Sequence, residues 1–309
     1  MSTTRTARVA AQAKINLTLR VLAREAGGFH QIETVFQRLA LADTVTVRMA
    51  MASSLDVAWG GPGAAPDLGP VEKNLAWRAA EAYAAAAYAA AAHWPGGFAI
   101  EIEKRIPVGG GLGGGSADAA AVLRALDALA PTPLGAQALT DIAARLGADV
   151  AFLVSRSELA LAWGRGDRMF DLPPLPTAEV LLVVPTFGVN TAEAYAALAA
   201  HRAGTGAGTG AAPGAAWRSP RSLGSWNAVA ADAVNDFEPV VFDRHPELAT
   251  MRAQLAALPR AVFAMMSGSG STLFAVLGGP SGTTGALALP TGWTAISTAT
   301  AAAGGVELV

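Results

Sequence analysis

Six glycines lie between residues 109 and 115, at a junction that restricts how this chain can fold. The alternating run 98–103 before them predicts a half-buried strand, and residues 119–129 after them carry apolar side chains at helical spacing. Glycine has no Cβ, so such a loop can turn tightly and approach a ligand closely. Ser116 is predicted to cap the helix, whose N–H groups and dipole favour an anion. The segment therefore predicts a binding site for a phosphate chain.

Three other interpretations of this loop are weaker. A P-loop ends in Gly-Lys-Ser/Thr, whereas this loop ends in Gly-Gly-Ser-Ala. A dinucleotide-binding fingerprint needs an acidic residue at the end of the next strand, and no second strand is evident before about residue 150. A glycine-rich turn without a ligand is the remaining alternative, and the position of the glycines directly at a helix N-terminus argues against it.

Composition limits the class of protein. The chain has 309 residues, enough for two domains, and its 52% hydrophobic and 15% charged residues indicate sizeable cores. A net charge of −2 argues against a general nucleic-acid binder. There is no cysteine, which excludes disulfides, thiolate metal sites and a cysteine nucleophile.

No targeting segment is evident. Residues 1–13 contain arginines but no apolar stretch of signal length, and the alanine-rich run 82–92 is too short to span a bilayer. We therefore expect a cytoplasmic protein with neither a membrane nor a nucleic acid as partner.

Hydrophobic periodicity outlines the elements. In the first half we expect strands at 8–21 and 36–51, a Gly/Pro loop at 62–70, helices at 74–93, 119–129 and 136–146, a strand at 150–154 and a turn within 159–170. The prolines at 173, 174 and 176 predict a domain boundary. Beyond it we expect a buried strand from residue 179, a surface loop over 204–225, a helix after Asn227 and two strand pieces within 261–277 separated by 267–271.

A few polar residues stand out against this background. The only lysines are Lys14, Lys73 and Lys104, in a chain that otherwise uses arginine, which indicates that a compact ammonium is needed at Lys14 and Lys104. Strand alternation places Lys14 and Asn16 on one face. Asp149 opens an apolar run. Taken singly, each of these is an ordinary surface or capping residue.

In combination, these segments resemble the GHMP kinase superfamily over nearly the whole chain. The resemblance is carried by the segments at 13–17, 28–36, 41–45, 74–80, 104–118, 146–150, 188–195, 235–238 and 266–271. The Gly-Phe-His segment at 28–30 is similar to the branch with a cytidine-bearing substrate, rather than to the kinases of mevalonate, homoserine or galactose.

The resemblance implies an α+β fold in two domains, an ATP-binding domain over 1–175 and a C-terminal domain over 176–309, with the active site in the cleft between them. It implies ATP-dependent phosphorylation of the 2-hydroxyl of 4-diphosphocytidyl-2-C-methyl-D-erythritol, in the non-mevalonate route to isoprenoid precursors. The expected assembly is a monomer or a weak homodimer.

The resemblance also implies roles for individual residues. Asp149 is expected to be the general base and Lys14 its partner, with Mg²⁺ held mainly by the ATP phosphates rather than by the protein. The substrate is expected to meet Asn16, Phe29, His30, Tyr195, Gly268 and Gly270. The ATP-binding residues are expected to be Asn74, Lys104, Pro107, Val108, Gly109, Gly110, Gly111, Leu112, Gly113, Gly114, Gly115, Ser116 and Ala117.

The chain departs from the family pattern at three of these places. Ala117 stands where a second serine is common, Phe29 where tyrosine is usual and Ala151 where proline is common. None of these removes a group that the chemistry needs. Two alternatives stay open, a GHMP kinase acting on another small alcohol and a non-catalytic nucleotide-binding protein.

Overall fold

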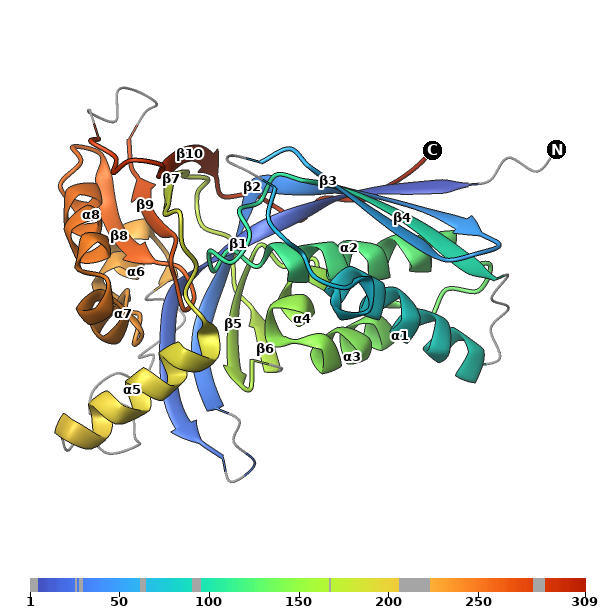
Figure 1. Cartoon of the computed structure of the whole chain (residues 1–309), viewed down its shortest axis with the longest axis horizontal. Helices are drawn as coiled ribbons and strands as arrows, with labels where there is room; N and C mark the ends of the chain where they lie inside the picture. Colours follow the sequence, from blue (N-terminus) through green and yellow to red (C-terminus); the bar gives the residue numbers. More distant parts are fainter. Residues whose placement is uncertain are drawn as a thin grey trace.

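The protein is described here from a computed structural model of the chain. The structure describes residues 5–25, 27, 30–61, 65–90, 96–166, 168–205, 223–279 and 287–309. Figure 1 shows two sheets, each with its own helices, that meet along one side.

The larger sheet is mixed and is built around two long strands, β1 (Thr6–Arg24) and β2 (His30–Ala50). Its main order is β11-β1-β2-β4-β3, where β3 is Ser54–Trp59, β4 is Gly97–Lys104 and β11 is Val306–Leu308. The first half of β2 pairs instead with β5 (Leu159–Gly164), which pairs with β6 (Arg168–Asp171). Among the described strands of this sheet, only β3 and β4 pair in parallel. The last strand of the chain thus joins its first.

Helices from the first half of the chain cover one face of this sheet (Figure 1). They are α1 (Leu75–Ala89), α2 (Gly114–Leu129), α3 (Ala136–Leu146) and α4 (Ala148–Val154), preceded by the short 3₁₀ helix η1 (Val71–Lys73). Helix α2 is the central one: ten of its residues are buried, and it packs against β1 and β2 as well as against α1 and α4. Burial of this apolar surface is the main stabilising contribution to the larger unit.

The smaller sheet is antiparallel, in the order β10-β7-β9-β8. Its strands are β7 (Glu179–Val184), β8 (Ala261–Met266), β9 (Leu273–Leu277) and β10 (Thr294–Ala299). Alternation along β7 directs Val180 and Leu182 to the core of the larger unit and Leu181 and Val183 to a second core. The helices nearby are α5 (Thr191–Thr205), α6 (Trp226–Asp232), α7 (Glu238–Arg244) and α8 (Pro246–Ala256).

The predicted elements agree with most of this, with two corrections. Residues 150–154 were expected to be a strand but lie in helix α4, because a short apolar run buried on all sides has no periodicity that separates strand from helix. Ser116 does not cap α2. Gly113, with φ 73°, is the N-cap, so the helix begins two residues before Ser116.

Several expectations fall outside the described residues. Phe29, the end of the predicted helix at 91–93 and most of the predicted loop 204–225 cannot be compared. The division at residue 175 lies between β6 and β7 and stays a prediction.

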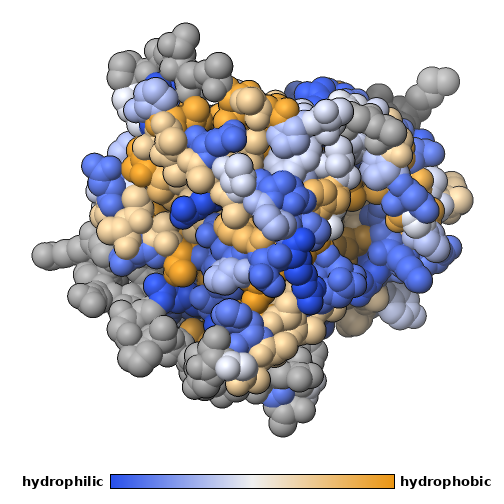
Figure 2. Space-filling view, turned by 60° about the vertical axis from the view of Figure 1, so that its left-hand side comes forward, coloured by the Kyte–Doolittle hydropathy of each residue, from blue (hydrophilic) through white to orange (hydrophobic). Residues whose placement is uncertain are grey.

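The exposed apolar side chains are scattered, and Figure 2 shows apolar areas interrupted by hydrophilic residues over one face. None of the helices in the described part of the chain has the length and apolar character needed to cross a membrane.

Candidate active site

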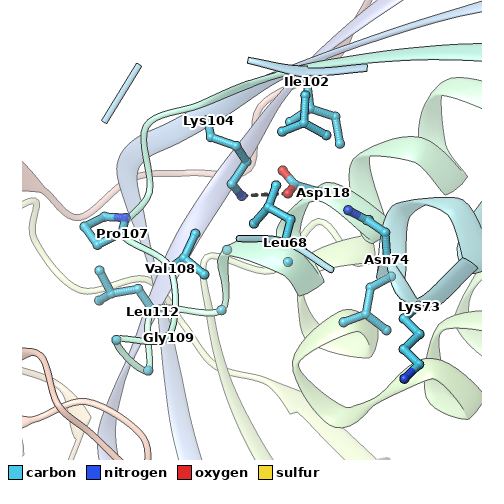
Figure 3. A pocket seen from close by; sticks show the side chains of 17 residues that line it. Leu68, Lys73, Asn74, Ile102, Lys104, Pro107, Val108, Gly109, Leu112 and Asp118 are labelled. Carbon is cyan, nitrogen blue, oxygen red and sulfur yellow. Dashed lines mark hydrogen bonds and ion pairs between the residues drawn. The ribbon is translucent and has the colours of Figure 1, made fainter. Parts of the chain in front are cut away.

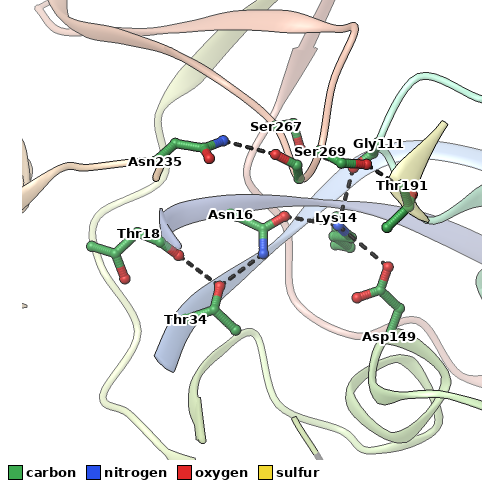
Figure 4. Close-up of polar contacts among 11 residues, drawn as sticks. Lys14, Asn16, Thr18, Thr34, Gly111, Asp149, Thr191, Asn235, Ser267 and Ser269 are labelled. Atoms are coloured by element: carbon green, nitrogen blue, oxygen red, sulfur yellow. Dashed lines mark hydrogen bonds and ion pairs between the residues drawn. The ribbon is translucent and has the colours of Figure 1, made fainter. Parts of the chain in front are cut away.

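A buried ammonium and a carboxylate meet where the larger sheet touches the helices. Lys14, on β1, is only 2% exposed, and its Nζ lies 3.3 Å from Oδ2 of Asp149 (Figure 4). Asp149 is in the first turn of α4, where the helix dipole favours an anion, and its side chain is 33% exposed. The pair expected from the sequence therefore exists, with the carboxylate as the accessible member.

Hydrogen bonds hold Lys14 in place. Its Nζ donates to Oδ1 of Asn16 at 2.8 Å, and Asn16 in turn donates to Oγ1 of Thr34 at 2.7 Å. The Thr34 hydroxyl donates to the carbonyl of Thr18 at 2.6 Å. The β1–β2 register shifts between Gln12 and Lys14 and again between Asn16 and Thr18, and such irregularities re-aim side chains. Lys14 and Asn16 thus share one face, as predicted, and reach the same point.

The glycine loop passes directly beside this pair. The Lys14 Nζ also donates to the carbonyl of Gly111 at 3.0 Å. Gly109, Gly111 and Gly113 all have φ between 73° and 79°, a region that side chains with a Cβ rarely adopt. A Cβ on Gly113 would lie 3.1 Å from Lys14 side-chain carbons and 3.6 Å from Oδ2 of Asp149. The backbone of the loop therefore lies directly against the charged pair.

Position 117 faces the core rather than the loop. Ala117 is 1% exposed, and its N–H makes the first helical hydrogen bond, to the carbonyl of Gly113 at 2.8 Å. Ser116 is half-buried at the start of α2. Of these two positions, only Ser116 carries a hydroxyl, in the first turn of the helix.

A pocket of about 230 Å³ opens beside the loop. In Figure 3, Lys73 and Asn74 lie on one side of it and Pro107, Val108 and Gly109 on the other. Asn74 caps helix α1 through its Oδ1, which accepts the N–H of Ala76 at 2.9 Å. Every residue from Pro107 to Gly115 lines the pocket, as do Lys104 and Asp118. Lys73, the one lysine to which we assigned no role from the sequence, also lines the pocket.

Lys104 is placed differently from a free ligand-binding lysine. The residue is 3% exposed, and its ammonium pairs with Asp43 and, at 2.6 Å, with Asp118. Burial lowers the pKa of Lys104, but attraction to Asp118 and Asp43 outweighs it and leaves this pKa raised. The ammonium is thus occupied within the wall of the pocket.

Two aromatic rings define another part of the predicted site. His30, at the start of β2, stacks on Tyr195 of α5 with 4.1 Å between ring centroids and 15° between planes. Burial and the nearby Asp149 carboxylate raise the pKa of Tyr195 to about 12. His30 and Tyr195 are therefore brought together. Phe29 lies outside the described residues.

The loop between β8 and β9 closes over the glycine loop. A Cβ on Gly268 would lie 3.3 Å from the carbonyl oxygen of Gly111 and 3.6 Å from Nζ of Lys14. A Cβ on Gly270 would meet Met266 at under 3.0 Å, so neither glycine tolerates a side chain without movement. Asn235 holds this loop by donating to the carbonyls of Met266 and Gly268, both at 2.8 Å.

Sequence reasoning assigned no role to several of these residues. Asp43, Asp118, Asn235 and Ser267 all lie inside segments that carry the family resemblance, and this was the only signal that could have selected them. Among the described residues, no group of three or more His, Asp and Glu could hold a metal ion.

The chemistry available here is transfer of a phosphoryl group. Backbone N–H groups at a helix start bind phosphates, an ammonium stabilises the charge of the group in transit, and a carboxylate accepts a proton. The two-sheet α+β fold and this loop beside a Lys–Asp pair define a GHMP kinase.

Comparisons with known proteins support this class. Residues 74–156 match the model of the GHMP kinases N terminal domain, and residues 217–282 match that of the GHMP kinases C terminal. The chain is 40% identical to a 4-diphosphocytidyl-2-C-methyl-D-erythritol kinase of Solibacter usitatus (strain Ellin6076), over 89% of this chain and 82% of that protein.

Solved structures agree. A crystal structure of 4-(cytidine 5'-diphospho)-2C-methyl-D-erythritol kinase superposes with a TM-score of 0.67 and 34% identity, covering 88% of this chain and 91% of that one. A homoserine kinase from Cytophaga hutchinsonii shares the fold, with a TM-score of 0.63 at 15% identity over 100% of this chain and 98% of its own. The chain belongs to the 4-diphosphocytidyl-2-C-methyl-D-erythritol kinase family, phosphotransferases with an alcohol group as acceptor.

Proposed function

We propose that this chain transfers the γ-phosphoryl group of ATP to the 2-hydroxyl of 4-diphosphocytidyl-2-C-methyl-D-erythritol, a step of the non-mevalonate route to isoprenoid precursors. The observation that carries the proposal is the position of the Lys14 ammonium, 3.3 Å from the Asp149 carboxylate and 3.0 Å from the Gly111 carbonyl. One group thereby touches both the predicted base and the predicted phosphate loop.

In the proposed mechanism, the oxygen of the 2-hydroxyl bonds to the γ-phosphorus of ATP while Asp149 accepts the hydroxyl proton. The bond between the γ-phosphorus and the ADP oxygen breaks, and ADP leaves. The exposure of Asp149 allows contact with an acceptor, while Lys14 lies 3.3 Å from its carboxylate and holds it beside the glycine loop. Lys14 also stabilises the charge on the phosphoryl oxygens. Such positioning and electrostatic stabilisation supply most of the catalysis in phosphoryl transfer.

ATP is proposed to occupy the pocket beside the glycine loop. The loop, from Pro107 to Ala117, would hold the phosphates through its backbone, and Asn74 and the backbone of Lys104 would lie near the adenine. Mg²⁺ prefers oxygen ligands and retains phosphates and waters, and it neutralises phosphate charge when bound. The hydroxyl of Ser116 is a suitable oxygen donor at this end of the helix.

The cytidine end of the acceptor is proposed to lie at His30 and Tyr195, with Phe29 completing the pocket. A flat base suits aromatic stacking, and the His30 ring can hydrogen-bond its polar edge. The stacked His30 and Tyr195 rings support a site for a base. Asn16, Gly268 and Gly270 are proposed to line the path of the acceptor between this site and Asp149.

We also propose a cytoplasmic enzyme that is active as a monomer or weak homodimer. The supporting argument is that the reaction draws on ATP and small-molecule substrates alone.

An acceptor panel tests the proposal. ADP release is measured with 4-diphosphocytidyl-2-C-methyl-D-erythritol, mevalonate and homoserine, and the product is examined by ³¹P NMR. We expect ADP and a new phosphomonoester only with the cytidylated acceptor, and we expect CDP to compete with it. Equal turnover of mevalonate or homoserine would point to a kinase for another alcohol. If none of the three acceptors leads to ADP release, the proposal is contradicted.

A further inference from the structure

Three consecutive carbonyls of the glycine loop are held by other parts of the chain. The carbonyl of Gly110 accepts the N–H of Thr272 at 3.2 Å, and the carbonyl of Leu112 accepts the N–H of Lys14 at 3.0 Å. Between them, the carbonyl of Gly111 accepts two donors, the Lys14 ammonium at 3.0 Å and the Ser267 hydroxyl at 2.9 Å. Two of the four donors belong to the loop between β8 and β9.

These contacts determine where the N–H groups point. In a planar trans peptide the C=O and the N–H lie on opposite sides, so a carbonyl held against the protein directs its N–H partner away from it. The N–H groups of Gly111, Leu112 and Gly113 belong to the three peptides whose carbonyls are held, and they have no hydrogen-bond partner in the described part of the chain. They therefore point away from the groups that hold the loop and are available as donors to an anion.

Ser267 is a rigid donor for this purpose. It is 0% exposed, its N–H donates to the carbonyl of Thr272 at 2.9 Å, and its carbonyl accepts the N–H of Gly270 at 3.0 Å. The contact with the glycine loop is also close, because a Cβ on Gly111 would lie under 3.0 Å from the Ser267 carbonyl oxygen. In Figure 4, Ser267 and Lys14 approach Gly111 from two elements far apart in the sequence.

We propose that Ser267 is a positioning residue for the nucleotide: it touches no phosphate itself but orients the Gly111–Leu112 peptide so that its N–H faces the phosphates. The inference rests on the proposed function, since it assumes that ATP binds at this loop. It makes the β8–β9 loop a part of the ATP site as well as of the acceptor site.

The chain offers a matched control in the same loop. Thr272 is also 0% exposed and lies against Gly110, but its Oγ1 has no hydrogen-bond partner among the described residues. Thr272→Val removes that hydroxyl at nearly constant volume and keeps the backbone N–H. Ser267→Ala removes a hydroxyl that donates a hydrogen bond to the carbonyl of Gly111. The two variants therefore separate the hydrogen bond from the general loss of a buried hydroxyl.

The test is the affinity for a non-hydrolysable ATP analogue, measured by calorimetry on wild type, Ser267→Ala and Thr272→Val. Losing one hydrogen bond while Lys14 still holds Gly111 predicts about a three- to tenfold rise in Kd for Ser267→Ala. The KM for ATP should rise in parallel, with the KM for the acceptor unchanged. Thr272→Val should bind the analogue like wild type.

Three results would overturn the inference: wild-type affinity in Ser267→Ala, an equal loss in Thr272→Val, or an acceptor KM that rises as much as the analogue Kd. If wild type itself does not bind the analogue, the proposed function fails, and the inference fails with it. If wild type binds and Ser267→Ala is indistinguishable from it, only the inference fails.

Discussion

The buried cluster in the wall of the nucleotide pocket holds two carboxylates for one ammonium. Asp43 is 0% exposed, pairs with Lys104, and accepts the N–H groups of Arg105 at 2.5 Å and Ile106 at 2.7 Å. Asp118 also pairs with Lys104, at 2.6 Å, but its Oδ1 has no hydrogen-bond partner among the described residues. The two carboxylates are thus unequal, and we predict that their removal has unequal effects on stability.

The perturbation is Asp118→Asn, compared with Asp43→Asn. Burial raises the pKa of Asp118 to about 7, with Lys104 lowering it and Asp43 raising it further. The folded protein therefore binds this proton more tightly than the unfolded chain, where the pKa has its usual value of 3.8. The resulting contribution to the free energy of unfolding is fully present below about pH 3.8 and is lost as the pH rises to about 7. The free energy lost is on the order of a few kcal/mol.

At pH 8 we therefore expect Asp118→Asn to have an unfolding free energy equal to or above that of wild type. Lys104 keeps Asp43 as its partner, and the buried excess charge is gone. In Asp43→Asn, an amide replaces a carboxylate that accepts three hydrogen bonds, so its single oxygen cannot serve the Lys104 ammonium and both backbone N–H groups in their present places. We expect that variant to lose roughly 1–3 kcal/mol.

Urea unfolding at pH 8 and pH 5.5 measures both effects. The advantage of Asp118→Asn over wild type should shrink at pH 5.5, where Asp118 is protonated in the folded protein. The reasoning is refuted if Asp118→Asn is destabilised as much as Asp43→Asn at pH 8, or if its difference from wild type does not change with pH.

Three further predictions concern the site. Asp149→Asn should lower kcat about 10²- to 10⁴-fold with an unchanged melting temperature, and near-wild-type turnover would remove Asp149 as the base. Gly111→Ala and Gly109→Ala carry the same left-handed strain, but only Gly111→Ala drives a Cβ into the Ser267 carbonyl. Thermal unfolding should therefore show Gly111→Ala as clearly less stable, and equal melting temperatures would contradict the closeness of that contact. His30→Ala should raise the KM for the cytidylated acceptor and leave the KM for ATP unchanged, so an equal rise in both would argue against a role in base binding.

Features that depend on a local sequence pattern could be predicted from the sequence alone. The glycine loop between a strand and a helix, helix α3 at 136–146 and the shared face of Lys14 and Asn16 could all be predicted from periodicity and glycine content. The resemblance to a family added Asp149, which periodicity alone placed in the wrong element.

The remaining features depend on contacts between distant segments. Nothing local to Ser267 indicates that its hydroxyl meets Gly111, and nothing local to Lys104 indicates that Asp43 and Asp118 occupy its ammonium. Strand β3 was missed although its exposure alternates, because its pairing with β4 is a parallel, long-range contact. Such pairings are decided by the tertiary fold, which overrides local propensity.

The central claim is that Asp149 and Lys14 act on one phosphoryl transfer at the end of the glycine loop. Its most direct test is a crystal structure with a non-hydrolysable ATP analogue and the cytidylated acceptor bound together. We predict the terminal phosphate against the Lys14 ammonium, and the acceptor 2-hydroxyl within about 3.2 Å of an Asp149 carboxylate oxygen. A complex in which the 2-hydroxyl faces the terminal phosphorus while both side chains lie out of reach of it would contradict the account.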